Sequence, residues 1–246
     1  MKGWLVVFAK EPQAGRVKTR LSPPFSPAAA AAFYRCMLAD VLEESAAAAA
    51  LLGLDAVLAV DPPGSAADMA SAAPASFRVI AQADGDLGTR MGVVALQAAA
   101  AGADLALFRG SDSPCLDRTA MREALGSLTR ADLVIAPDRD GGYDLVALGP
   151  RALDRAARGC LFDHPMSHPG VLRETLARAG ALHAHLLDSG FDIDGFDDLR
   201  SLAEVRAAGG ARACPRTLTF LDAHALWPAP RVAAGVAATA RSDHRS

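Results

Sequence analysis

The sequence of 246 residues has little of what proteins use to bind nucleic acid or a membrane. Aromatic residues make up only 5% of it, which argues against a surface on which bases stack. The formal net charge is −3, so the chain lacks the broad positive field that attracts nucleic acid or anionic lipid. No stretch approaches the ~20 consecutive apolar residues that span a bilayer. These absences predict a protein without a nucleic-acid or membrane partner.

Signals for export are also missing from the sequence. The four cysteines show no C-x-x-C spacing, and we expect them to be free thiols. The apolar opening of the chain ends at Lys10 and Glu11, which is too early for a signal peptide, and its residues suit a buried strand. Both observations predict a cytoplasmic protein.

The composition is that of a globular protein. Hydrophobic residues make up 51% of the chain and charged residues 22%, so a substantial core can form. No break in composition occurs before about Trp227, and the residues beyond it are rich in Ala, Arg, Ser and Pro without a core pattern. We therefore expect one domain over residues 1–226 and a loose tail over residues 227–246.

Strand and helix signals alternate along the chain. Apolar runs predict strands over residues 5–9, 56–60, 77–81, 105–108, 133–136, 143–148 and 182–187. Amphipathic or capped stretches predict helices over residues 27–52, 87–101, 117–128, 167–179 and 197–207. This alternation implies a single-domain α/β fold with a mostly parallel central sheet. The strand over 143–148 follows its predecessor too closely for a crossover helix, so it pairs antiparallel or lies outside the main run.

The loop after the first strand is basic. It carries Lys10, Arg16, Lys18 and Arg20 around Gly15. Ligands of open α/β sheets bind beyond the carboxyl ends of the strands, where such a loop can hold a polyanion. The alternative is a solvated surface loop.

Two familiar phosphate motifs are absent from this loop. A Walker A motif needs a glycine directly before its lysine, and Lys18 follows Val17. No G-x-G-x-x-G follows the first strand either. These absences argue against a kinase, a P-loop ATPase and a dinucleotide-dependent oxidoreductase.

A second glycine-containing loop follows the third strand. It holds Gln82, Gly85, Asp86, Gly88 and Arg90 at the start of a predicted helix, whose backbone N–H groups could receive an anion. The alternative is an ordinary turn in which Asp86 caps the helix.

Three aspartates are candidate metal ligands. Asp112 follows the buried fourth strand, where a carboxylate is costly unless it is paired or metal-bound. Mg²⁺ or Mn²⁺ would take one or two such carboxylates together with phosphate oxygens. Asp192 and Asp194 lie on one side of an extended segment and could add a ligand. The alternatives are that Asp112 caps the next turn and that Asp194 or Asp197 caps the next helix.

The histidines argue less for a metal. His164 and His168 are four residues apart, but Pro165 disfavours a shared helical face. With no third ligand close by in the sequence, a zinc site is not expected there.

These motifs, in order over about residues 4–205, resemble the bacterial family DUF2064, whose members are described as glycosyltransferases associated with radical-SAM and selenium-domain genes. The matching segments are Phe8-Ala9-Lys10-x-Pro12-x-x-Gly15-x-Val17-Lys18-Thr19-Arg20-Leu21, Gln82…Gly85-Asp86-Leu87-Gly88-x-Arg90-Met91, Gly110-Ser111-Asp112-x-Pro114-x-Leu116, Pro137-x-x-Asp140-Gly141-Gly142-Tyr143-x-Leu145 and Asp192-Ile193-Asp194…Asp198-Leu199. One segment departs from the family, because Met166-Ser167-His168 stands where Trp-Ser-Thr is usual.

The resemblance implies a GT-A-like, three-layer fold of the nucleotide-diphospho-sugar transferase superfamily, distantly similar to the phospholactate and molybdenum-cofactor guanylyltransferases. It places Lys10, Lys18 and Arg20 near the nucleotide phosphates. It makes Asp112 a ligand of the divalent ion, with Asp192 or Asp194 as the second. The acceptor or sugar would be bordered by Asp140, Gly141 and Gly142, and Asp140 or Asp194 is the candidate general base.

Three functions are consistent with these residues. The first is a metal-dependent transfer of a glycosyl group from a nucleotide-sugar to a small acceptor. The second joins a nucleoside triphosphate to a phosphorylated small molecule, and it needs the same pyrophosphate site. The third is a nucleotide-binding protein without catalysis. All three require that Lys18 and Asp112 meet at one site.

Overall fold

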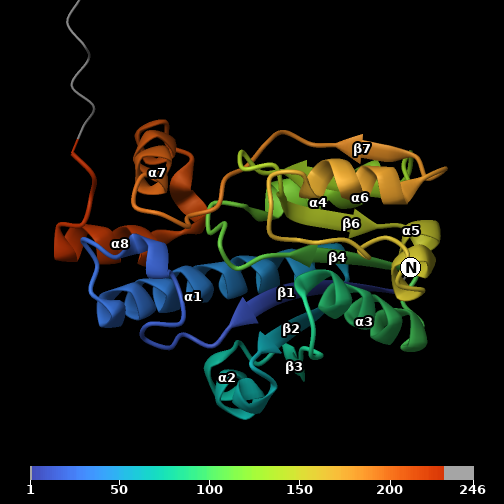
Figure 1. Cartoon of the computed structure of the whole chain (residues 1–246), viewed down its shortest axis with the longest axis horizontal. Helices are drawn as coiled ribbons and strands as arrows, with labels where there is room; N and C mark the ends of the chain where they lie inside the picture. The colour runs from blue at the N-terminus through green and yellow to red at the C-terminus, as the bar shows by residue number, and fades with distance from the viewer. Residues whose placement is uncertain (1, 230–246) are drawn as a thin grey trace, which may run out of the picture.

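A seven-stranded sheet with the order β3-β2-β1-β4-β6-β5-β7 forms the centre of the molecule in a computed structural model that describes residues 2–229 (Figure 1). The strands are β1 (Gly3–Lys10), β2 (Asp55–Asp61), β3 (Arg78–Ala81), β4 (Leu105–Arg109), β5 (Leu133–Pro137), β6 (Tyr143–Leu148) and β7 (Ala184–Leu186). β6 runs antiparallel to β4 and β5, and the other neighbouring strands are parallel. The predicted, mostly parallel sheet is confirmed, and the antiparallel alternative for 143–148 is the observed one.

Eight α-helices and three short 3-10 helices are found in the described part of the chain. The α-helices are α1 (Pro27–Leu52), α2 (Ala66–Ala72), α3 (Leu87–Ala100), α4 (Arg118–Ser127), α5 (Pro150–Ala157), α6 (Val171–Ala179), α7 (Asp198–Ala207) and α8 (Pro215–His224). The 3-10 helices are η1 (Thr19–Leu21), η2 (Pro63–Ser65) and η3 (Ala211–Ala213). No α-helix among residues 2–229 has the length and apolar character to cross a membrane.

Five of the predicted helices are observed, and three were missed. α1 begins as expected, with Ser26 accepting a hydrogen bond from the Ala29 amide. The helix predicted over 167–179 starts only at Val171, because Pro169 disfavours helical backbone at the residue before it. α2 is short, and α5 and α8 begin at prolines, a start signal that was not used. The predicted tail lies outside the described residues from position 230 onwards.

The two faces of the sheet are covered by different helices, which makes three layers (Figure 1). On one face Leu5 and Val7 of β1 pack with residues of α1 and α4. On the other face Val6 and Phe8 pack with residues of α3 and α5. Because both faces are covered, the central strands are nearly continuous apolar runs.

A third apolar cluster joins the first loop to the end of the chain. It contains Leu21 of η1, Phe33 of α1, Ile193, and Leu202 of α7. This cluster anchors residues 190–195 close to the loop that follows β1.

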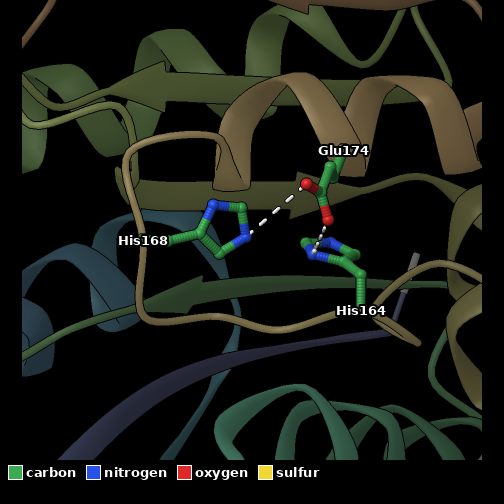
Figure 2. A group of neighbouring side chains, drawn as sticks. All are labelled: His164, His168 and Glu174. Atoms are coloured by element: carbon green, nitrogen blue, oxygen red, sulfur yellow. Dashed lines mark ion pairs between the residues drawn. The ribbon is translucent and has the colours of Figure 1, made fainter.

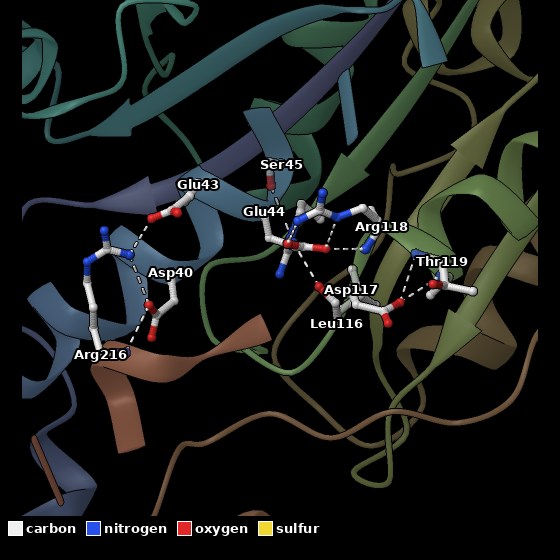
Figure 3. A network of polar contacts seen from close by, with 11 residues as sticks. Asp40, Glu43, Glu44, Ser45, Leu116, Asp117, Arg118, Thr119 and Arg216 are labelled. Carbon is white, nitrogen blue, oxygen red and sulfur yellow. Dashed lines mark hydrogen bonds and ion pairs between the residues drawn. The ribbon is translucent and has the colours of Figure 1, made fainter. Parts of the chain in front are cut away.

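Two carboxylates on α1 hold the starts of other helices (Figure 3). Asp40 accepts hydrogen bonds from the Thr217 amide and hydroxyl, each at 2.8 Å, at the first turn of α8. Glu44 accepts a bond of 2.7 Å from the Arg118 amide at the first residue of α4. These contacts satisfy N–H groups that helices leave unpaired at their N-termini.

Candidate active site at the carboxyl ends of the central strands

Lys18 lies between two aspartates from distant parts of the chain. Its ammonium is 2.5 Å from Oδ1 of Asp112, which follows β4, and 3.0 Å from Oδ1 of Asp194. The lysine side chain is 4% exposed, and the two aspartates are 41% and 42% exposed. The predicted meeting of the basic loop with the acidic tip of the fourth strand is confirmed.

The backbone around Lys18 is unusual. Lys18 has φ of 49°, in the left-handed region that costs a non-glycine residue on the order of 1 kcal/mol. Burial disfavours its ammonium form, but Asp112 and Asp194 outweigh burial and raise the pKa of Lys18 above its ordinary value. Lys18 is therefore a buried, permanent cation, and its ion pairs offset the cost of its backbone.

Tyr34 of α1 supports the same corner of the sheet. Its hydroxyl lies 2.7 Å from Oγ of Ser111 and accepts a hydrogen bond of 3.1 Å from the Lys10 amide. Burial and the nearby Asp112 raise the pKa of Tyr34 to about 12, so the hydroxyl stays protonated. Tyr34 thus ties the ends of β1 and β4 together beside Lys18.

A second acidic group lies next to this ion pair. Asp138 after β5, Asp144 on β6 and Asp192 have carboxylate oxygens within 4.8 Å of one another. Asp144 is 3% exposed, and neither of its oxygens has a hydrogen-bond partner among the described residues. Ser113 donates a short hydrogen bond to Asp192. Burial raises the pKa of both Asp144 and Asp192, and their mutual charge adds to the shift of Asp144.

This acidic cluster fits a divalent cation. Removing carboxylates from water is costly without a compensating charge, and the oxygens of Asp144 have none bonded to them. Carboxylate oxygens are the ligands that Mg²⁺ and Mn²⁺ prefer. Asp138 and Asp144 were missed in the sequence, although a carboxylate inside the apolar strand β6 is the signal that could have revealed them.

The three predicted metal ligands fall into two neighbouring groups. Asp112 and Asp194 bind Lys18, and Asp192 joins Asp138 and Asp144. The Ile193 amide donates to the Asp112 carbonyl at 2.9 Å, which holds this segment against the end of β4. Ile193 itself is buried, so the flanking aspartates lie on the opposite side of the extended chain.

The capping alternatives for these aspartates do not match the contacts. The carboxylate of Asp198 accepts the hydrogen bonds from the Asp194 and Gly195 amides. Asp197 precedes α7 but makes no capping bond with its side chain. Asp112 likewise is paired with the lysine across the site.

Arg109 is a buried residue of this site that sequence reasoning missed. It ends β4 and donates hydrogen bonds to the carbonyls of Ser113 at 2.8 Å and Leu116 at 3.2 Å. Burial lowers the pKa of Arg109 to about 10, so it remains charged at neutral pH. Arg109 therefore shapes the loop that carries Asp112.

The remaining basic residues of the first loop are on the surface. Lys10, Arg16 and Arg20 are exposed, and Arg20 lies 3.6 Å from Oδ2 of Asp194. Gly15 has φ of 76° in open space. These side chains are free to meet an anion from solvent, and their phosphate-binding role stays a prediction.

The loop after β3 makes mainly structural contacts. Gln82 is buried and donates to the carbonyls of Ala9 and Ala59 at 3.3 and 2.8 Å. Arg90 forms an ion pair of 2.8 Å with Asp61. Asp86 caps α3 through the Thr89 amide, as the capping alternative predicts, and the Cα of Gly88 packs against the Phe162 carbonyl. The phosphate role predicted for Gln82, Gly85, Asp86, Gly88 and Arg90 stays a prediction.

The turn between β5 and β6 meets the loop that precedes α6. Gly141 has φ of 87°, and a Cβ there would lie 2.1 Å from the Pro169 carbonyl oxygen, so only glycine fits. Gly142 lies beside Asp138. Asp140 is exposed, and it is Asp138 rather than Asp140 that joins the acidic cluster.

Several solved structures share this fold. The chain is 25% identical, with a TM-score of 0.77, to a Desulfovibrio desulfuricans G20 protein provisionally assigned as a nucleotide-diphospho-sugar transferase, covering 91% of this chain and 96% of that one. A cytidylyltransferase from Leptospira borgpetersenii is 10% identical with a TM-score of 0.55, covering 94% and 99%. The 4-diphosphocytidyl-2C-methyl-D-erythritol synthase of Anaerococcus prevotii DSM 20548 is 10% identical with a TM-score of 0.53, covering 84% and 98%. The two less similar structures show the fold alone.

Sequence comparison leads to the same family as the motifs. No curated protein matches the chain. The model of DUF2064, described as "Uncharacterized protein conserved in bacteria", matches residues 44–168, about half of the chain. With the motifs in order and the fold shared, the chain belongs to the DUF2064 family.

Proposed function

We propose that the protein is a divalent-cation-dependent transferase whose donor is a nucleotide-diphosphate sugar and whose acceptor is a small molecule. The observation that carries the proposal is the buried Lys18 ammonium between Asp112 and Asp194, directly beside the cluster of Asp138, Asp144 and Asp192. A site that holds one buried cation among five carboxylates is built to balance a second, larger positive charge. The similarity to the Desulfovibrio desulfuricans protein supports the same class of donor.

The residues divide the task by charge. A cation bound in the acidic cluster would offset the negative charge that develops on a departing diphosphate. Asp192 and Asp112 are its expected ligands, with Asp144 as the buried neighbour that lacks a partner. Once a cation neutralises Asp112, the Lys18 ammonium can turn from the carboxylate to a phosphate oxygen. Lys18 would then stabilise the leaving group from a fixed position.

The exposed residues would receive the two substrates. Lys10 and Arg20 are placed to offset phosphate charge at the end of β1. Asp140, Gly141 and Gly142 border the space next to the acidic cluster, where we place the sugar or acceptor. Asp140 and Asp194 are the exposed or half-exposed carboxylates available to accept the acceptor's proton.

A second candidate function is nucleotidyl transfer from a nucleoside triphosphate. It is favoured by the number of basic residues in the first loop, because Lys10, Arg16, Lys18 and Arg20 could together offset three phosphates. The shared fold with a cytidylyltransferase is compatible with it. Both functions use the same diphosphate site and differ in the donor.

Donor binding measured with Mn²⁺ or Mg²⁺ tests the proposal. The thermal midpoint of the protein would be recorded with UDP- and GDP-sugars and with each nucleoside triphosphate, with and without the metal. We expect metal-dependent stabilisation by a nucleotide-sugar, its loss in Asp112→Asn and Asp192→Asn, and no loss in the exposed control Asp188→Asn. Stabilisation by a triphosphate alone selects nucleotidyl transfer. An unchanged response in Asp112→Asn contradicts both.

Catalysis is tested separately from binding. Release of free nucleotide from the stabilising donor in the presence of candidate acceptors would be followed by chromatography. A protein that binds the donor with the metal but never cleaves it with any acceptor would be the non-catalytic nucleotide-binding protein.

A further inference from the structure

Two histidines and a glutamate meet where the loop over residues 162–170 passes the first turns of α6 (Figure 2). Nδ1 of His164 lies 3.7 Å from Oε2 of Glu174, and Nε2 of His168 lies 3.6 Å from Oε1 of the same carboxylate. The histidines point toward Glu174 from the loop below it (Figure 2). The third ligand that the sequence seemed to lack is therefore supplied by α6, six residues beyond His168 in the chain.

We propose that His164, His168 and Glu174 bind a transition-metal ion, with Zn²⁺ as the best-suited ion, at a site separate from the acidic cluster of the candidate active site. Imidazole nitrogens favour Zn²⁺ over Mg²⁺ or Ca²⁺, which take oxygen ligands. The three side chains come from a loop and a helix rather than from one helical face, so Pro165 does not prevent the site.

The spacing of the ligand atoms suits a four-coordinate ion. The Pro165 carbonyl oxygen lies 3.0 Å from Nδ1 of His164 and 3.1 Å from Nε2 of His168, and it supplies the fourth ligand. Zinc–ligand bonds of about 2.1 Å in a tetrahedron place the ligand atoms about 3.4 Å from one another. The observed separations of 3.0 to 3.7 Å bracket that value.

The outer contacts of His164 direct its free nitrogen at this point. The Thr175 hydroxyl donates to the Tyr143 hydroxyl at 3.4 Å, which leaves its oxygen to accept the Nε2 proton of His164 at 2.9 Å. Nδ1 of His164 is then a lone pair that faces the Pro165 carbonyl and the Glu174 carboxylate, which are also acceptors. Three acceptors directed at one point need a cation between them.

His168 has a local change to make when the ion binds. The Gly170 amide donates to Nδ1 of His168 at 3.0 Å, so the ring proton is now on Nε2. Binding through Nε2 moves the proton to Nδ1 and breaks the bond from Gly170. His168 and Glu174 are about one-third exposed, at 32% and 36%, so an ion can reach them from solvent.

The ion would fix the loop over 162–170 to α6. That loop holds the turn between β5 and β6, through the packing of Pro169 on Gly141, and the Leu172 amide donates to the Gly141 carbonyl at 2.9 Å. If the proposed function holds, this turn borders the acceptor, and the metal would set its position. Metal binding itself does not depend on the proposed function.

The test is a titration of the untagged, full-length protein with Zn²⁺ alone, in competition with a coloured chelator. We expect one equivalent bound by the wild type, and a four-coordinate visible spectrum when Co²⁺ replaces Zn²⁺. His168→Ala and Glu174→Gln should each weaken this equivalent by more than about 100-fold, and Thr175→Val by about 10- to 100-fold, the range for an outer contact. The exposed histidine in His185→Ala is the matched control and should change nothing.

Two further measurements keep the result clear. Zn²⁺ binding that survives in Asp144→Asn but is lost in His168→Ala belongs to this site and not to the acidic cluster. The amide signal of Gly170 should shift on binding in the wild type and not in His168→Ala, which also reports that the variant is folded. Equal Zn²⁺ affinity in the wild type, His168→Ala and Glu174→Gln overturns the proposal. Stabilisation by mild acid with no response to Zn²⁺ also overturns it, and leaves two histidine–carboxylate ion pairs.

Discussion

Nζ of Lys18 lies 2.5 Å from Oδ1 of Asp112, and this ion pair joins the loop after β1 to the end of β4. The two strands are neighbours in the sheet, so their carboxyl ends bring these residues to one edge. Asp194 binds the same ammonium at 3.0 Å from the far end of the chain. A single buried cation thus connects three segments, and its removal tests the site most directly.

Replacement of Lys18 by methionine should abolish transfer while the chain stays folded. The change leaves Asp112 and Asp194 without their shared cation, and a lost charge-assisted contact of this kind costs about 1–3 kcal/mol. We expect donor turnover to fall by at least about 100-fold, because charge stabilisation at the leaving group is lost. Turnover and urea unfolding would be measured together. Arg122→Met, which removes an exposed charge on α4, should leave both at the wild-type value.

The metal-free protein should lose stability as the pH rises from mildly acidic to mildly alkaline. Burial raises the pKa of Asp144 above its ordinary value of 3.8, so the folded state binds this proton more tightly than the unfolded state does. The stabilisation is complete below the ordinary value and is lost as the pH climbs through the raised one. Asp144→Asn should flatten this slope in chelator-treated protein and raise the unfolding free energy by roughly 1–3 kcal/mol at pH 8.

The same variant should respond oppositely when metal is present. Added Mn²⁺ should stabilise the wild type and flatten its pH dependence, whereas Asp144→Asn should gain less. A wild-type profile that is flat without metal would show that Asp144 is not a buried acid of the kind described.

Alanine at position 190 should disturb the acidic cluster through packing alone. A Cβ on Gly190 would lie 2.1 Å from Oδ2 of Asp144, and no part of the buried strand β6 can move away cheaply. Overpacking of this kind costs about 1–3 kcal/mol, and we expect metal binding to weaken with it. Gly64→Ala, where no atom lies within 4 Å, is the control and should unfold like the wild type. Equal stability of the two variants would contradict the close contact.

Asp40 and Glu43 offer a matched pair on α1 (Figure 3). Asp40 is fully buried and caps α8 through Thr217, whereas Glu43 is 65% exposed and binds only Arg216. Asp40→Ala should lower the unfolding free energy by about 2–4 kcal/mol, because it orphans buried donors as well as removing the cap. Glu43→Ala should cost less than about 1 kcal/mol, as surface ion pairs usually do. Similar losses in both would show that α8 is held by other contacts.

Local patterns predicted most of the architecture. The apolar runs at 56–60 and 105–108 had to be buried strands, and Ser26 followed by Pro27 had to begin a helix, because these signals need no knowledge of the rest of the chain. The same is true of the basic loop around Lys18 and of Asp112, since the carboxyl end of a strand is where a parallel sheet collects its polar residues. The helix α8 lacked a comparable local signal, because Asp40, far away on α1, caps it.

The sequence by itself therefore determined which elements form and which charges stand at their ends. Only the tertiary structure decided which of those charges meet: that Asp192 joins Asp138 and Asp144 while Asp194 joins Lys18, and that Glu174 completes the pair of histidines. The physical reason is that periodicity and capping act over a few residues, whereas the partner of a buried charge is chosen by the sheet order and by the packing of loops that are distant in the chain.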